Sequence, residues 1–153
     1  MQLISLLGAK LKAPATLELL RGYEDELRIR YIIDVWDDGI PDYYEAQVEP
    51  AGFLFQLNKN QTIYAIHCYI KPRYNFSPID PALIGAPAYA SVEAVVAAAH
   101  QLGCTAKTFE PFEGCGGVRQ MASLHFGDHS RHYDFADGDL TEITLSLPTR
   151  DVP

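Results

Sequence analysis

The chain has 153 residues and a mass of 17.0 kDa, which is the size of one ordinary domain. With 48% hydrophobic and 21% charged residues, the composition excludes a disordered chain and predicts a folded core. The formal net charge of -8 disfavours binding to nucleic acid or to an anionic membrane, and it favours a basic partner.

The amino-terminal segment and the cysteines indicate the compartment. Segment 1–12 has no positive region ahead of its apolar residues, and no run approaches the roughly 18 apolar residues that span a bilayer. Cys68, Cys104 and Cys115 are an odd number without CxxC spacing, which argues against a disulfide framework and a structural zinc site. We therefore expect a cytoplasmic protein with reduced thiols and no membrane contact.

The first half of the chain is predicted to fold as helices followed by a strand meander. Apolar residues at helical spacing predict helices over 3–11 and 16–22. Runs of β-branched and aromatic residues then predict four strands, over 27–35, 43–48, 53–57 and 63–70. Four prolines in segment 71–87 predict a linker after them.

The second half is predicted to repeat this order. Ser91 is a good N-cap residue and Gly103 a good residue to end a helix. The apolar residues between them that share one helical face are Val92, Val95, Val96 and Ala99. A glycine-rich loop is expected around Cys115. After it, alternating residues and two turns predict a meander of three strands, over 122–126, 132–135 and 140–147.

The two halves show weak internal similarity. Leu6-Leu7-Gly8-Ala9 matches Leu83-Ile84-Gly85-Ala86, and the hairpin over 55–70 resembles the hairpin over 133–147. The middle parts, 22–52 and 102–130, do not align, so chance similarity is the alternative. We expect an α+β fold with helices packed on antiparallel sheet. It forms one domain over 1–153, with related helix-plus-meander halves 1–76 and 77–153.

Motifs of catalysis are absent from the sequence. There is no GxGxxG, phosphate loop, GxSxG, HExxH or EF-hand spacing, so we predict no enzyme, no catalytic residue and no cofactor. His125, His129 and His132 lie within eight residues together with Asp128. We interpret them as a polar turn with His125 and His132 on paired strands and His129 exposed near the turn, and we predict no metal site. The alternative is a small enzyme or a ligand- or metal-binding protein that uses the His125–His132 hairpin and the Cys115 loop.

The strongest functional pattern is the acidic segment 31–58, which holds six carboxylates and no Lys or Arg. Aromatic residues interleaved with carboxylates are typical of an interface with a basic protein surface. The predicted partner-binding residues are Trp36, Asp37, Asp38, Asp42, Tyr43, Tyr44 and Glu45. Alternation along a strand would turn only one of the two tyrosines outward. The alternatives are a solvated acidic loop whose rings turn inward and, more weakly, a calcium site.

Asp42-Tyr43-Tyr44-Glu45, in a small acidic chain, resembles bacteriocin immunity proteins, in which carboxylates and adjacent tyrosines bind a basic nuclease domain. The likeness is to the longer immunity proteins of S-type pyocins, since the chain is too long and too strand-rich for the helical colicin type. It covers overall character and one short motif. The resemblance implies a protein without catalysis that neutralises the cytotoxic domain, a DNase, of a cognate toxin. It could occupy the active site directly or bind beside it, and we favour the second mode because a carboxylate surface repels phosphate.

Overall fold

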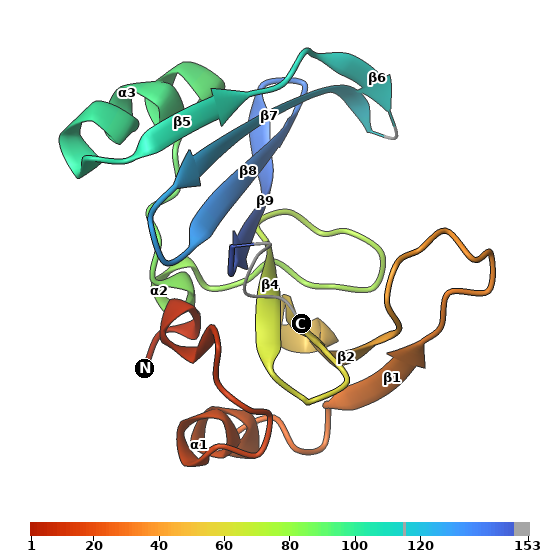
Figure 1. Cartoon of the computed structure of the whole chain (residues 1–153). Helices are drawn as coiled ribbons and strands as arrows, with labels where there is room; N and C mark the ends of the chain where they lie inside the picture. The colour runs from red at the N-terminus through yellow and green to blue at the C-terminus, as the bar shows by residue number, and fades with distance from the viewer. Residues whose placement is uncertain (115, 149–153) are drawn as a thin grey trace.

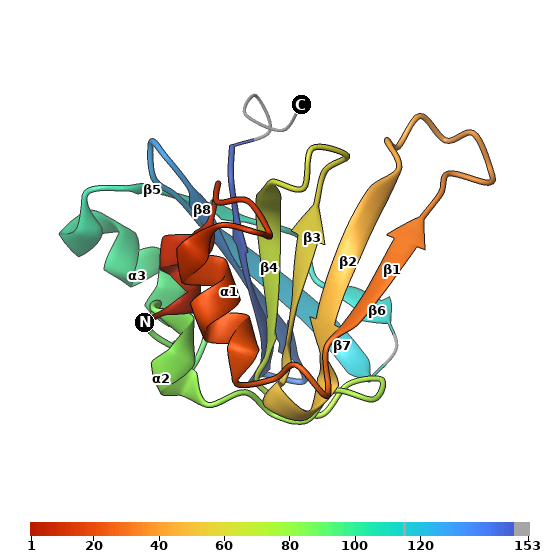
Figure 2. The same cartoon turned by 90° about the horizontal axis from the view of Figure 1, so that it is seen from below.

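The computed structural model describes residues 1–114 and 116–148, and one antiparallel sheet of nine strands dominates this part of the chain (Figures 1 and 2). The strands are β1 (Arg28–Ile32), β2 (Tyr43–Val48), β3 (Phe53–Leu57), β4 (Ile63–Tyr69), β5 (Thr105–Thr108), β6 (Phe112–Gly114), β7 (Gly117–His125), β8 (Ser130–Ala136) and β9 (Asp139–Ser146). Their order is β1-β2-β3-β4-β9-β8-β7-β5, and β6 pairs with β7. The predicted α+β class with an antiparallel sheet is confirmed.

The helices are short, and all but the 3-10 turn between β2 and β3 lie together on one side of the sheet (Figure 2). They are the α-helices α1 (Pro14–Arg21), α2 (Pro81–Ile84) and α3 (Val92–Leu102), and the 3-10 turns η1 (Leu3–Leu6) and η2 (Glu49–Ala51). α3 has the ends that the sequence predicts: the Ser91 hydroxyl accepts a hydrogen bond from the Ala94 N–H (3.1 Å), and Gly103 has a φ of 66°. In the described residues no helix is long and apolar enough to cross a membrane.

One hydrophobic core lies between the helices and one face of the sheet. It takes buried residues from both halves of the chain: Leu6, Leu20, Phe53, Phe55, Ile66, Val95, Tyr133 and Ile143. The halves meet in the ladder between β4 and β9, where Ile66 pairs with Leu145 and Cys68 pairs with Ile143. Because side chains alternate along a strand, these residues all face the helices, and one core continues across the junction.

The other face of the sheet carries polar side chains. Alternation places His67 of β4 beside Thr144 of β9, which in turn lies beside His132 of β8. Among the described residues no helix covers this face, because α1, α2 and α3 all pack on the opposite one (Figure 2). The segment after β4 covers one end of it, where Phe76 stacks on Tyr69 with ring centroids 4.4 Å apart. We call this side of the sheet the open face.

Several predicted boundaries were wrong. The helix predicted over 3–11 is only the 3-10 turn η1, since Gly8 has a φ of 82° and donates its N–H to the Ile63 oxygen (2.8 Å). The strand predicted over 27–35 ends at Ile32. Val96, predicted to lie on the buried side of its helix, is exposed. The end of η1 depends on the contact of Gly8 with Ile63, which is distant in sequence, and local periodicity does not report such contacts.

Two predicted irregular segments contain regular structure. The predicted linker over 71–87 holds α2 and packs Phe76 against the sheet, so it belongs to the folded unit. β5 was not predicted, and β6 lies in the glycine-rich segment that was expected to be a loop. β5 depends on pairing with the distant end of β7, where Thr105 pairs with His125, and β6 pairs with the start of β7, where Gly114 pairs with Gly117.

Candidate functional site

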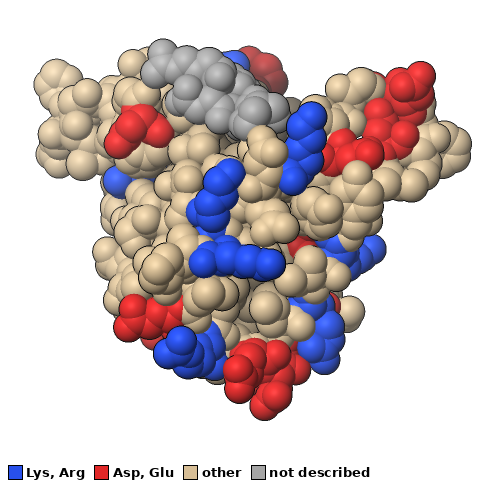
Figure 3. Space-filling model, turned by 60° about the horizontal axis from the view of Figure 1, so that its bottom comes forward, with Lys and Arg blue, Asp and Glu red and all other residues tan. Residues whose placement is uncertain are grey.

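The loop between β1 and β2, residues 33–42, projects beyond the end of the sheet (Figures 1 and 2). Acidic side chains gather on this projection, at the upper right of Figure 3. Trp36 is 82% exposed, and its apolar neighbours Ile33, Val35 and Ile40 are also exposed. We call residues 33–42 the acidic-aromatic loop.

Two of its carboxylates hold the loop in shape. Asp34 accepts hydrogen bonds from the backbone N–H groups of Asp38 (3.1 Å) and Gly39 (3.0 Å). Asp42 accepts one from the Asp34 N–H (2.9 Å) and one from the Tyr31 hydroxyl (3.0 Å). Side-chain carboxylates that bind nearby backbone groups order turns. The loop is therefore preorganised, and its order keeps the indole of Trp36 in water.

The two predicted tyrosine anchors point to opposite faces of β2. Tyr44 packs against the core, and its ring lies 4.7 Å from that of Tyr31. Tyr43 lies on the open face with Glu45, two residues along the strand. Burial, and then the neighbouring carboxylate of Glu45, raise the pKa of Tyr43, whereas Arg30 opposes the shift. The Tyr44 side chain thus helps to pack β2 against the core.

The structure brings Trp36, Asp37, Asp38 and Asp42 together on the loop, with Tyr43 and Glu45 at its base. Beside them lie two exposed apolar residues that were not among the predicted site residues, Ile29 and Tyr31 of the edge strand β1. Their signal was the apolar residues at alternate positions of 27–35. The pattern predicts a strand but not that β1 lies at the edge of the sheet with these side chains exposed.

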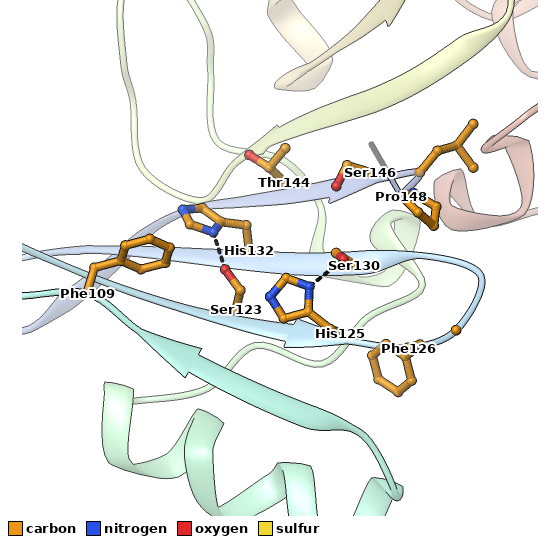
Figure 4. A pocket seen from close by; sticks show the side chains of 11 residues that line it. Phe109, Ser123, His125, Phe126, Ser130, His132, Thr144, Ser146 and Pro148 are labelled. Carbon is orange, nitrogen blue, oxygen red and sulfur yellow. Dashed lines mark hydrogen bonds between the residues drawn. The ribbon is translucent and has the colours of Figure 1, made fainter. Parts of the chain in front are cut away.

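The histidine hairpin lies on the open face (Figure 4). His125 of β7 and His132 of β8 occupy paired strands as predicted, but each is held by a serine: His125 Nδ1 lies 2.9 Å from the Ser130 hydroxyl, and His132 Nδ1 lies 2.5 Å from that of Ser123. His129 was predicted to be exposed. It is half-buried instead, because its ring stacks on Phe126 at 4.5 Å. Within 1–114 and 116–148, no three His, Cys, Asp or Glu side chains are placed to hold a metal ion.

These side chains line a cleft of about 690 Å³. Its lining residues carry hydroxyl, imidazole and apolar groups but no Lys, Arg, Asp or Glu: Phe109, Ser123, His125, Phe126, Gly127, Ser130, His132, Thr144, Ser146, Leu147 and Pro148. Ser123 is only 3% exposed, and the second nitrogen of His132 lies 4.0 Å from Asp134, beyond hydrogen-bond distance. The Ser123–His132 pair is thus neither accessible nor aligned with a carboxylate, as a nucleophile and its base would be. Cys115, the other candidate nucleophile, lies outside the described residues.

A network of buried charges continues from the cleft towards β4. Glu142 accepts hydrogen bonds from His67 (Nδ1 to Oε1, 2.7 Å) and from Arg73 (Nη1 to Oε2, 3.0 Å). Although burial acts in the opposite direction, these partners lower the pKa of Glu142. Burial lowers the pKa of His132 and raises that of Asp134. Glu142 and Asp134 are buried and their partners are only partly exposed, so we assign the network to the stability of the sheet.

Comparisons of the chain with protein-family models, with curated protein sequences and with solved structures give no match. The assignment of function therefore depends on the side chains themselves. Of the two surfaces, the acidic-aromatic loop presents a large ring to solvent from an ordered backbone, whereas the polar groups of the cleft bind one another.

Proposed function

We propose that the chain is a non-enzymatic inhibitor, an immunity protein that binds and neutralises the basic cytotoxic domain of a bacteriocin, a nuclease, through the acidic-aromatic loop. The observation that carries the proposal is Trp36, which is 82% exposed on a hydrogen-bonded loop among carboxylates. Large exposed apolar patches with polar rims mark interaction sites. The function proposed here is thus binding, with no chemical step.

The aromatic ring and the carboxylates of the acidic-aromatic loop have different roles in this proposal. Trp36 is the anchor, because buried interfacial tryptophans contribute most to affinity. Asp37 and Asp38 surround it and steer a basic domain to the correct orientation. The same carboxylates repel phosphate groups, so an inhibitor bound beside a nuclease site excludes DNA by both bulk and charge. We place this binding in the cytoplasm of the producing cell, before export of the toxin.

The test uses the toxin domain that this proposal expects to be encoded beside the gene, expressed with and without the chain. We expect cells to survive only when both are present, and the two purified proteins to form a 1:1 complex. Trp36→Ala should raise the Kd by about 30- to 700-fold, the equivalent of losing an interfacial anchor. The matched control is Tyr74→Ala, an exposed ring beyond the opposite end of β4. A Trp36→Ala variant that binds and protects like the unmodified chain would refute the proposal.

We further infer that halves 1–76 and 77–153 descend from one duplicated unit. Each half contains a short helix, a glycine of positive φ, a longer helix and a meander, and the glycines Gly8 and Gly85 have φ values of 82° and 83°. The turns Asn58-Lys59-Asn60 and Asp137-Gly138 join the last two strands of each half. If superposing the halves by their meanders leaves η1 and α2 unmatched, the duplication is refuted.

A further inference from the structure

A cavity of about 570 Å³ lies at the base of the acidic-aromatic loop, between it and the turn from β3 to β4. Three tyrosines line it, Tyr31, Tyr43 and Tyr64, together with Ile40, Pro41 and the carboxyl group of Asp42. The cavity therefore combines aromatic rings, two apolar side chains and a carboxylate. We call it the tyrosine cavity.

The surroundings of the rings are electronegative. Burial, and then the proximity of Tyr43 and Glu45, raise the pKa of Tyr64 to about 12. The hydrogen bond to Asp42 raises the pKa of Tyr31. Phenols close to carboxylates keep their protons, and the same arrangement attracts a cation. Lys59 also lines the cavity, but it is exposed, and its flexible stem allows the ammonium group to extend into water.

Asn58 orders the turn at one side of the cavity. Asn58 is 4% exposed, and its Oδ1 accepts hydrogen bonds from the N–H groups of Asn60 (2.9 Å) and Thr62 (3.1 Å). Its Nδ2 is buried without a hydrogen-bond partner. Through its Oδ1, Asn58 thus holds the turn between β3 and β4, which forms one wall of the cavity.

We propose that the tyrosine cavity receives an arginine side chain of the basic partner, an inference that rests on the function proposed above. A guanidinium ion stacks on aromatic rings and donates to a carboxylate with its planar fork. Tyr43 and Tyr64 offer the rings, and Asp42 offers the carboxylate. The methylene groups of the arginine pack against Ile40 and Pro41. Lysine fits less well, because its ammonium is compact and strongly hydrated.

The first test uses small probes, so that it does not depend on a partner. Nα-acetylarginine amide is titrated into the protein while the tyrosine ring signals are followed by NMR, and the citrulline analogue is the neutral control of the same shape. We expect the arginine probe to shift the Tyr43 and Tyr64 signals and to bind about 2- to 30-fold more tightly than the citrulline probe. No shift of these signals at 100 mM arginine probe, or equal binding of both probes, would overturn the proposal.

Paired substitutions distinguish a ring from a merely apolar wall. Tyr64→Phe keeps the ring face and should retain binding of the arginine probe, whereas Tyr64→Leu should weaken it by about 2- to 30-fold. Tyr43→Phe and Tyr43→Leu provide the same comparison at the second ring. Equal binding by the Phe and Leu variants, with folding confirmed by circular dichroism, contradicts stacking on the rings.

The same variants in the complex separate the two proposals. If the toxin domain binds and Tyr64→Leu leaves its Kd unchanged, the arginine site is refuted and the proposed function stands. If the arginine probe binds as expected but the toxin domain does not bind, the proposed function is refuted and the cation site stands. Loss of affinity for the toxin domain in Tyr64→Leu, with affinity kept in Tyr64→Phe, supports both.

Discussion

Glu142→Gln tests the buried charge network of the open face. Glu142 is almost fully buried on β9, and its two oxygens accept hydrogen bonds from His67, Arg73 and Thr144. Glutamine has the same shape but replaces one acceptor oxygen with an NH₂ donor. The substitution therefore removes the charge and leaves either the imidazole or the guanidinium facing a second donor.

The loss of stability in Glu142→Gln can be worked out from the hydrogen-bond partners of Glu142. Hydrogen bonds to charged groups contribute about 1.5–3 kcal/mol, and removing one partner of a buried ion pair costs about 3–5 kcal/mol. The Arg73 side chain is 34% exposed and can turn towards water, which lowers the cost. We expect Glu142→Gln to reduce the free energy of unfolding by about 2–3 kcal/mol and the Tm by about 4–12 °C.

The pH dependence gives a second readout. The pKa of Glu142 is lower in the folded protein than its ordinary value of 4.5. Its carboxylate therefore contributes stability in full above pH 4.5, and this contribution is lost as the pH falls through the folded-state pKa. Urea unfolding of both proteins from pH 7 to pH 3 should show the difference shrinking below pH 4.5. The control, Glu18→Gln on the exposed side of α1, should stay within about 0.5 kcal/mol. Equal stabilities at pH 7, or a difference independent of pH, would refute the reasoning.

Three further predictions concern backbone, loop and thiol. Gly52→Ala should lower the free energy of unfolding in urea by about 3 kcal/mol or more, because a β-carbon there would collide with the backbone of the segment after β4. Gly138 has a similar φ but open space around it, so Gly138→Ala should cost only about 1 kcal/mol. Equal losses in the two variants would contradict this prediction. Trp36→Ala should leave the Tm unchanged and Tyr44→Ala should lower it, since only the second ring packs on the core. In a variant with the other two cysteines replaced by serine, Cys68 should not react with a thiol reagent until the chain unfolds, because the side chain is buried and burial raises its pKa. Fast labelling of the native protein would show that Cys68 is not buried.

Strands with a strong local pattern were predictable from the sequence. The predicted ranges 43–48 and 53–57 match β2 and β3, since aromatic and β-branched residues fill them and Gly52, with a φ of 79°, separates them. β6 was not predictable, because its three residues form a strand only through pairing with β7. The burial of Glu142 likewise depends on Arg73, 69 positions earlier in the chain.

The acidic-aromatic loop could be found from composition, because its carboxylates and Trp36 are adjacent in sequence. The ordered conformation of the loop could not be predicted, because the carboxylates of Asp34 and Asp42 accept hydrogen bonds from backbone N–H groups only once the turn has formed. The tyrosine cavity could not be predicted from the sequence either. Tyr43 and Tyr64 meet there because β2 and β4 both flank β3, and that order of strands is a property of the whole fold.

The ladder between β4 and β9 can form only late in synthesis of the chain. It joins residues far apart in sequence, such as His67 and Thr144, which are 77 positions apart. At 5–20 residues per second a ribosome needs about 4–15 s to add that many residues. A meander formed by β1 to β4 during this interval would leave the edge of β4 unpaired, a surface prone to intermolecular pairing. The arrival of β9 covers that edge, so the nascent first half is the form in which this chain is most exposed to aggregation.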